Sequence, residues 1–194
     1  MIRILTNDPS VTAWGWAVIE MNPAGNPRKI QVVEVGCIST QPQHKKLRLR
    51  VSDDDTRRYG EIVYGLKTVI DRHHVQFITS EAPHGSQSSK AAKAFGAVAA
   101  LLQTVSILTG IPVEWYSEGD AKKFLSGGRA NLTKKETIKL VSDYYTVPWA
   151  GIGYRDEAVA DALAVFHVAL GTSPALRMFY SGAVKNPSPL KRTK

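Results

Sequence analysis

Three carboxylates stand where ordinary packing would not place them. Asp8 follows the apolar segment 2–6 in an Asn-Asp-Pro-Ser turn, and Glu81 comes directly after the apolar segment 75–80. Asp161 lies in a run of small and branched apolar residues whose helix would be mostly buried. Taken singly, each acid has an ordinary explanation: turn formation for Asp8, a loop position for Glu81, and an ion pair with Arg or Lys for Asp161. A buried carboxylate is costly unless it is paired or bound to a metal, and for Asp161 we favour a metal.

Together these acids indicate a particular chemistry. A fold that gathers Asp8, Glu81 and Asp161 needs cations, because like charges repel. Mg²⁺ (or Mn²⁺) suits a site built of carboxylate oxygens. Two such ions, roughly 3.5–4 Å apart, can activate water and stabilise the leaving oxygen in phosphodiester hydrolysis. The set therefore predicts a metal-dependent nuclease with two ions in each active site.

A fourth acid lies near Asp161. Asp156 and Glu157 precede it on the same predicted helix, where acidic residues also stabilise a helix N-terminus. Glu157 and Asp161 are four residues apart and share a helix face, so both can reach one site. Asp156, five residues before Asp161, points roughly 140° away on a regular helix.

The net charge favours a polyanionic partner. Lys and Arg number 25 against 17 Asp and Glu, which gives a net charge of +8, and a basic surface attracts nucleic acid. Five basic residues in and between two predicted helices are candidate phosphate contacts, although a solvated basic surface is the ordinary explanation: Lys122, Lys123, Arg129, Lys134 and Lys135.

The single cysteine, Cys37, suits a reducing cytoplasm. No uninterrupted apolar run reaches the length of a membrane span.

The elements that must position these residues alternate along the chain. Patterning predicts strands at residues 2–6, 14–21, 30–38, 75–80 and 113–116. Helices are expected at 53–73, 89–109, 117–125 and 155–170, with another beginning after Thr133, whose capping box includes Glu136. This order predicts an α/β fold: an antiparallel meander plus parallel strands in one mixed five-stranded sheet, with helices on both faces. Residues 1–172 would form this domain and residues 173–194 a flexible basic tail.

Four motifs in this order resemble the RuvC-type Holliday junction resolvases, which have an RNase H-like fold in the retroviral integrase superfamily. They are Ile-Leu-Thr-Asn-Asp-Pro-Ser with the following Trp-Gly-Trp, the strand that ends in Glu81, the basic segment 121–135, and Asp-Glu-Ala-Val-Ala-Asp-Ala-Leu-Ala ending at Ala164. The resemblance spans about residues 1–170. It implies an endonuclease that resolves four-way DNA junctions by paired nicks, leaving 5′-phosphate and 3′-hydroxyl ends.

Carried over residue by residue, the resemblance makes Asp8, Glu81 and Asp161 metal ligands. The family usually has an acid or a histidine three residues before the last Asp, where this chain has Ala158. We therefore expect Glu157 as the fourth ligand, with Asp156 as its substitute if the helix begins later. His84 stands where some members have an aromatic residue that stacks at the junction, and it could contact DNA or be an ordinary loop residue.

The resemblance also implies a homodimer, with one site for each of two opposed strands. The Ala-rich segment 91–108 is the expected dimer surface, because small residues allow close helix approach; its alternative role is packing on the chain's own sheet. Two other functions stay open. One is a broader branched or flap DNA nuclease on the same fold, and the other is a catalytically inactive nucleic-acid-binding protein.

Overall fold

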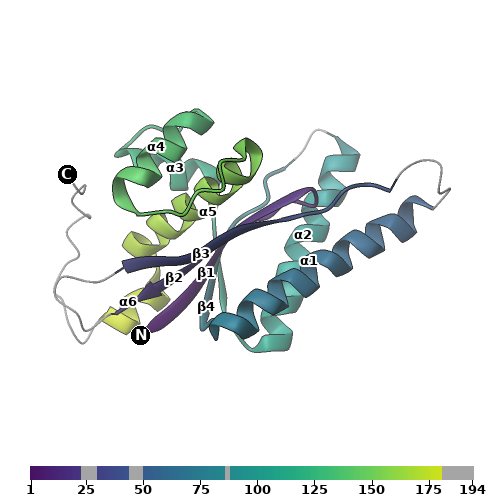
Figure 1. Ribbon diagram of the computed structural model, residues 1–194, viewed down its shortest axis with the longest axis horizontal. Coiled ribbons are helices and arrows are strands. Elements are labelled where there is room, and N and C mark those ends of the chain that lie inside the picture. The colour runs from purple at the N-terminus through teal and green to yellow at the C-terminus, as the bar shows by residue number, and fades with distance from the viewer. Residues whose placement is uncertain (23–29, 44–49, 86–87, 181–194) are drawn as a thin grey trace.

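The computed structural model describes residues 1–22, 30–43, 50–85 and 88–180. Three strands come first, and strands then alternate with helices (Figure 1). The elements are β1 (Ile2–Asp8), β2 (Ala13–Met21), β3 (Ile30–Ser39), α1 (Val51–His73), β4 (Phe77–Glu81), α2 (Ser89–Thr109), β5 (Val113–Tyr116), α3 (Glu118–Ser126), α4 (Lys134–Tyr144), α5 (Gly153–Thr172) and α6 (Pro174–Tyr180).

The strands form one mixed sheet in the order β3-β2-β1-β4-β5. The first three strands pair antiparallel, whereas β4 runs parallel to both β1 and β5. The predicted meander followed by parallel strands is therefore confirmed. Because β1 and β4 are adjacent and parallel, their carboxyl ends lie at the same edge of the sheet.

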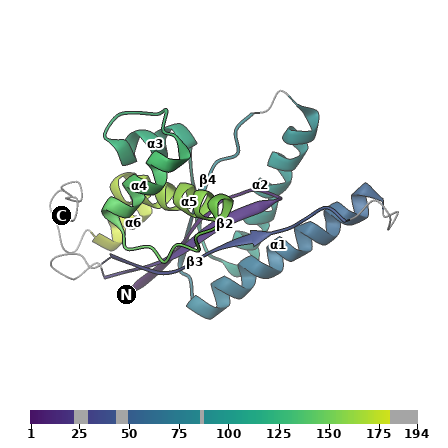
Figure 2. The ribbon, with the colours of Figure 1, turned by 45° about the horizontal axis from the view of Figure 1, so that its top comes forward.

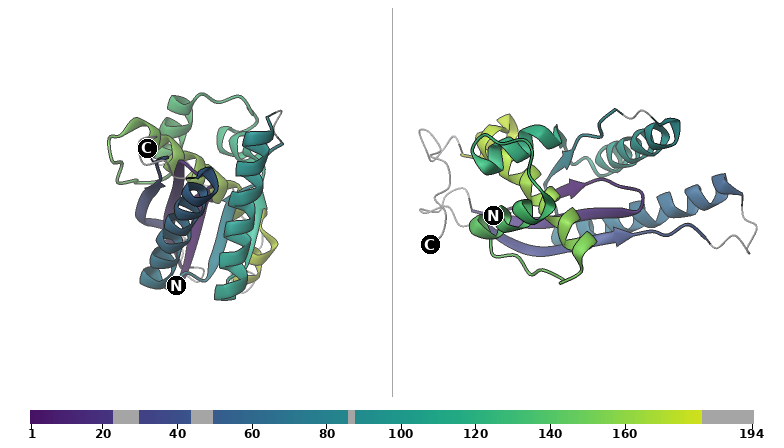
Figure 3. Two further views of the ribbon diagram at one scale, coloured as in Figure 1. Left: turned by 90° about the vertical axis from the view of Figure 1, so that its right-hand side faces the viewer. Right: turned by 90° about the horizontal axis from the view of Figure 1, so that it is seen from above.

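Helices cover both faces of the sheet, as predicted. Helices α1 and α2 lie side by side on one face, and α3, α4 and α5 lie on the other (Figures 1 and 3). Side chains alternate along each strand, so Ile4 of β1 packs on the α5 side, while Leu5 packs on the α1 side. Trp14 and Trp16 are buried on the α1 side of the sheet and are packing residues.

Strand β1 extends two residues beyond its predicted end, whereas β4 begins two residues later and ends one residue later than its pattern predicted. The polar residues at the ends of both strands are held inside the sheet. The Asn7 side chain donates to the Thr79 carbonyl at 3.2 Å and accepts from the Trp14 indole N–H at 3.0 Å. Asp8 and Glu81 are consequently the last residues of their strands and take the strand's alternation of faces.

Helix α5 approaches the sheet unusually closely. A Cβ built on Gly15 of β2 would lie 2.7 Å from the Ala158 Cβ and closer still to the Ala158 carbonyl. The buried Thr6 hydroxyl donates to the Ala162 carbonyl at 2.6 Å. These two contacts fix the position of α5 over β1 and β2, and Asp161 lies between them along the helix.

The predicted tail at residues 173–194 begins too early. Helix α6 occupies Pro174–Tyr180, and Ser173 and Leu176 are fully buried. Leu176 belongs to the core around α5, so tertiary packing orders a segment whose sequence has little periodicity. The remainder of that segment, residues 181–194, lies outside the described residues.

Helix α2 is long and apolar enough to cross a membrane by length and composition alone, and 22% of its apolar window is buried. One side of it packs into the core through residues such as Val98 and Leu102. Its outer side exposes Phe95, Ile107 and Leu108. Helix α2 lies at the outside of the molecule, next to α1 (Figure 2).

Gly15→Ala should destabilise the protein by about 1–3 kcal/mol, because the added methyl meets the backbone of Ala158 and overpacks the core. Gly60→Ala is the matched control: a Cβ there has no neighbour within 4 Å, and alanine favours the middle of α1. Denaturant unfolding should show lower stability for the first variant and equal or higher stability for the second. Equal stability of Gly15→Ala and the wild type would contradict the close docking of α5.

Candidate active site

The carboxylates of Asp8 and Glu81 end adjacent parallel strands. Asn7 is paired with Ser80, so the next residue on each strand is one of these acids. Asp8 and Thr6 share a face of β1, and the Thr6 hydroxyl contacts α5 on that face. Asp161 is buried on α5, one residue before the carbonyl that Thr6 holds. The fold therefore brings the three predicted acids to one end of the sheet.

Burial and mutual repulsion together raise the pKa values of these acids. Burial raises the pKa of Asp8 to about 7, and the charge of Asp161 adds to the rise. Burial, followed by the charge of Asp8, raises the pKa of Glu81 to about 8. The pKa of Asp161 is also raised by burial, although its ion pair with Lys134 opposes the rise. These acids form one electrostatic cluster, although 73 residues separate the first two in sequence and 80 the last two.

A positive charge already lies among these acids. The Lys134 ammonium pairs with Asp161 Oδ2. Burial lowers the pKa of Lys134, but Asp161, Asp8 and Glu118 outweigh it and leave the pKa raised. Asp161 Oδ1 is buried and has no hydrogen-bond partner among the residues that the structure describes. Carboxylate oxygens with an unsatisfied buried acceptor fit a divalent cation.

Glu118 belongs to the same cluster, and our sequence analysis missed it. It begins α3 two residues after Tyr116, which is paired with Glu81. Its charge raises the pKa of Asp8 and of Glu81. The sequence did contain a signal for Glu118, since this acid follows the end of β5, a strand that is parallel to β4. It was overlooked because acids are common in the first turn of a helix.

The structure separates the two acids at the start of α5. The Asp156 carboxylate accepts the Ala150 backbone N–H at 2.9 Å, so it supports the preceding loop. Glu157 is half-buried and makes no hydrogen bond or ion pair with another described residue. Glu157 as the fourth ligand stays a prediction.

The predicted phosphate contacts divide into two groups. Lys122 and Lys134 lie in the cluster, where Lys122 pairs with Glu118 and has 12% of its side chain exposed. The second group consists of three exposed residues: Lys123, Arg129 and Lys135. Of these, Arg129 pairs with Glu136 at 3.1 Å. A cavity of about 420 Å³ opens beside Glu118 and Lys122 and is also lined by Asn131 and Thr133. A polyanion that enters this cavity would meet Lys122 and Glu118.

Two histidines differ in their roles. His167 is buried, and its Nδ1 is 2.8 Å from the Tyr145 hydroxyl, which confirms it as a packed residue. Burial lowers its pKa to about 4. His84 is exposed and lies against the acid cluster: its ring nitrogen and carboxylate oxygens of Glu81 and Glu118 lie within 4.8 Å of one another.

The fold and the acid cluster define an RNase H-like nuclease. The family model described as crossover junction endodeoxyribonuclease RuvC matches residues 4–168, and the chain belongs to this family. The predicted resemblance, fold class and enzyme class are confirmed.

Relatives and solved structures agree with this assignment. The RuvC proteins of Moorella thermoacetica and Protochlamydia amoebophila are each 28% identical to the chain over 84% of its length, and the matches cover 87% and 88% of those proteins. The structure of T. thermophilus RuvC in complex with Holliday junction substrate has a TM-score of 0.69 at 21% identity, covering 93% of this chain and 98% of that one. The yeast mitochondrial Holliday junction resolvase Ydc2 has a TM-score of 0.50 at 10% identity, covering 94% and 86%.

Asp8→Asn should stabilise the metal-free protein at pH 8, by about 2–4 °C or more in Tm. The folded pKa of Asp8, about 7, is above its ordinary value of 3.8. The unfolded state therefore loses this proton first, and the carboxyl destabilises the folded state increasingly as pH rises between these values. The low pKa of His167 acts in the opposite direction below pH 6.5, but it is common to both proteins and cancels in their difference.

Thermal unfolding in chelator between pH 4 and pH 8 would measure this difference, which should shrink towards pH 4. Asp71→Asn is the control, because that carboxylate is 58% exposed in an ion pair on α1. An Asp8→Asn variant that is less stable than the wild type at pH 8 would contradict the clustering of the acids.

Proposed function

We propose that this protein is a structure-selective endonuclease that resolves four-way DNA junctions by paired, metal-dependent strand nicks. Family membership supports the reaction class. The single observation that carries the mechanism is the meeting of Asp8, Glu81 and Asp161 at one end of the sheet, with an unsatisfied carboxylate oxygen among them. The relative that is solved with a Holliday junction substrate suggests the branched substrate.

Asp8, Glu81 and Asp161, with Glu157 as the predicted fourth ligand, would hold Mg²⁺ or Mn²⁺, two ions in each site. When bound, these ions supply the charge that activates water and stabilises the departing oxygen. The carboxylates themselves hold the site at the sheet edge, and the cavity lined by Glu118 and Lys122 is the proposed entry for a DNA strand.

The basic residues would position the DNA. Lys122 and Lys134 lie among the acids, where each would place a phosphate next to the reacting group, while Lys123, Arg129 and Lys135 would contact the backbone farther out. Lysines of this kind hold DNA without distinguishing its sequence. We place the enzyme in the cytoplasm, where its free thiol at Cys37 stays reduced.

Cleavage of a synthetic four-way junction, beside linear duplex and a flap, tests this function. With Mg²⁺ or Mn²⁺ we expect symmetric paired nicks on the junction and none in chelator. Asp161→Asn should reduce the rate by about a hundredfold or more, because it removes a ligand from the site, whereas Asp71→Asn should not change it. Equal cutting of flap and junction would assign a broader branched-DNA nuclease. Tight junction binding without cleavage under either metal would assign a binding protein.

The enzyme would act as a homodimer through the outer side of α2. Ile107 and Leu108 are 71% and 78% exposed there, and Phe95 lies three turns earlier. Exposed apolar surface of this size is typical of an association site. The small residues Ala92, Gly96 and Ala100 are exposed on the same helix and would let a second copy of α2 approach closely. A two-fold arrangement would give each of two opposed junction strands its own site.

Ile107→Glu should convert the dimer to a monomer, because a charge would be buried at the association surface. Met178→Glu is the control, since Met178 on α6 is 78% exposed and α6 lies far from α2 (Figure 1). Sedimentation at micromolar concentration would measure both variants beside the wild type. A monomeric wild type would contradict the dimer, and co-sedimentation of that monomer with lipid vesicles would assign the apolar side of α2 to a membrane.

A further inference from the structure

The α5 helix lacks a side-chain ligand at the position nearest Asp8. Ala158 lies against Gly15, and Gly15 is paired with Asp8. A methyl group at position 158 leaves the cluster one oxygen ligand short on this side. The buried Asp161 Oδ1, in a side chain that is 7% exposed, has no partner among the described residues and leaves an acceptor open to a cation.

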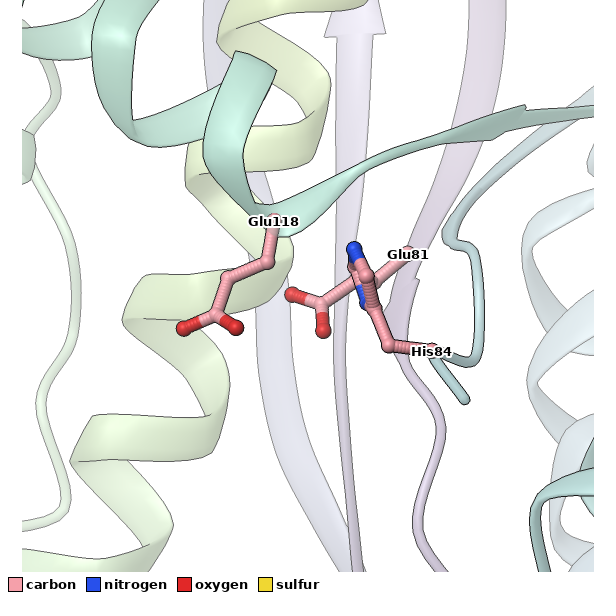
Figure 4. Close-up of side chains that lie close together, drawn as sticks. All are labelled: Glu81, His84 and Glu118. Atoms are coloured by element: carbon pink, nitrogen blue, oxygen red, sulfur yellow. The ribbon is translucent and has the colours of Figure 1, made fainter. Parts of the chain in front are cut away.

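Glu118 extends the cluster on its opposite side. The pairing of Glu81 with Tyr116 places Glu118 beside the end of β4, far from Ala158 along the sheet edge. Figure 4 shows the Glu81 carboxylate directed towards that of Glu118, with the His84 ring beside it. One ligand atom from each of these three side chains lies within 4.8 Å of the other two.

Capping of α3 does not require the Glu118 side chain. Ser117 already caps the helix, because its hydroxyl accepts the Asp120 backbone N–H at 3.0 Å and donates to the Asp120 carboxylate at 2.6 Å. The Glu118 side chain is 47% exposed and pairs with Lys122. The ammonium in this pair is largely buried, with 12% of the Lys122 side chain exposed.

We propose that Glu81, His84 and Glu118 bind one divalent transition-metal ion, and that Glu118 supplies the carboxylate that α5 lacks at position 158. This inference rests on the proposed nuclease function, which it refines. It changes the expected role of His84, whose ring nitrogen would bind the ion in place of stacking on DNA. It also predicts a metal preference, because imidazole suits transition-metal ions better than Mg²⁺.

Titration of the full-length, metal-free protein with Mn²⁺ alone, without DNA, tests this inference by calorimetry. Glu118→Gln should weaken Mn²⁺ binding about tenfold or more. Glu61→Gln is the matched control, because Glu61 on α1 is 45% exposed and also forms an i,i+4 ion pair, with Arg57. Unchanged Mn²⁺ affinity in Glu118→Gln would overturn the proposal.

His84→Phe separates metal binding from stacking. Phenylalanine keeps an aromatic ring and removes the nitrogen ligand, so Mn²⁺ affinity should fall more than Mg²⁺ affinity. Junction binding in chelator should not fall below that of the wild type, because an aromatic ring remains at this position. A variant that binds Mn²⁺ as tightly as the wild type would overturn the role of His84.

Asp161→Asn distinguishes failure of this inference from failure of the proposed function. If Asp161→Asn loses Mn²⁺ while Glu118→Gln and His84→Phe keep it, the active site stands and the inference is wrong. If all three variants bind Mn²⁺ like the wild type, both the inference and the proposed metal centre are wrong.

Discussion

The close approach of one helix to the sheet determines where the chemistry of this protein lies. Gly15 has no side chain, so Ala158 of α5 lies directly on β2, and four residues later the Ala162 carbonyl accepts the Thr6 hydroxyl. Asp161 is held between these anchors. An apolar helix has no local reason to bury a carboxylate. Tertiary docking forces this one against the ends of β1 and β4, where Asp8 and Glu81 already stand.

The acids and lysines at this end of the sheet balance one another. Lys134 pairs with Asp161 and Lys122 with Glu118, so two ammonium groups offset part of the charge that burial makes costly. A divalent cation would compete with the lysines for the same oxygens, and a phosphate would compete with the acids for the same lysines. Entry of metal among the carboxylates would therefore free Lys122 and Lys134 for DNA, which couples the two binding events.

The sequence predicted most of what depends on local pattern. Strand alternation, the helix at 89–109 and the Thr133 capping box all appear as expected, and the parallel strands explain why Asp8 and Glu81 meet. The rest depends on tertiary contacts. Helix α6 is seven residues long and has too few turns to show a period, yet packing buries Leu176. Glu118 looks like an ordinary acid in a helical first turn until β5 is placed beside β4.

The sheet register explains why a carboxylate at position 118 forms a different site from a carboxylate at position 158. A ligand at position 158 would stand over Gly15, beside Asp8, because those strand positions are paired. A ligand at position 118 enters from beyond β5, beside Glu81, because Tyr116 and Glu81 are paired. The two arrangements carry similar charge but place it at opposite ends of the cluster. Charge that is moved towards Glu81 lies next to His84, and Glu118 also lines the cavity beside Lys122.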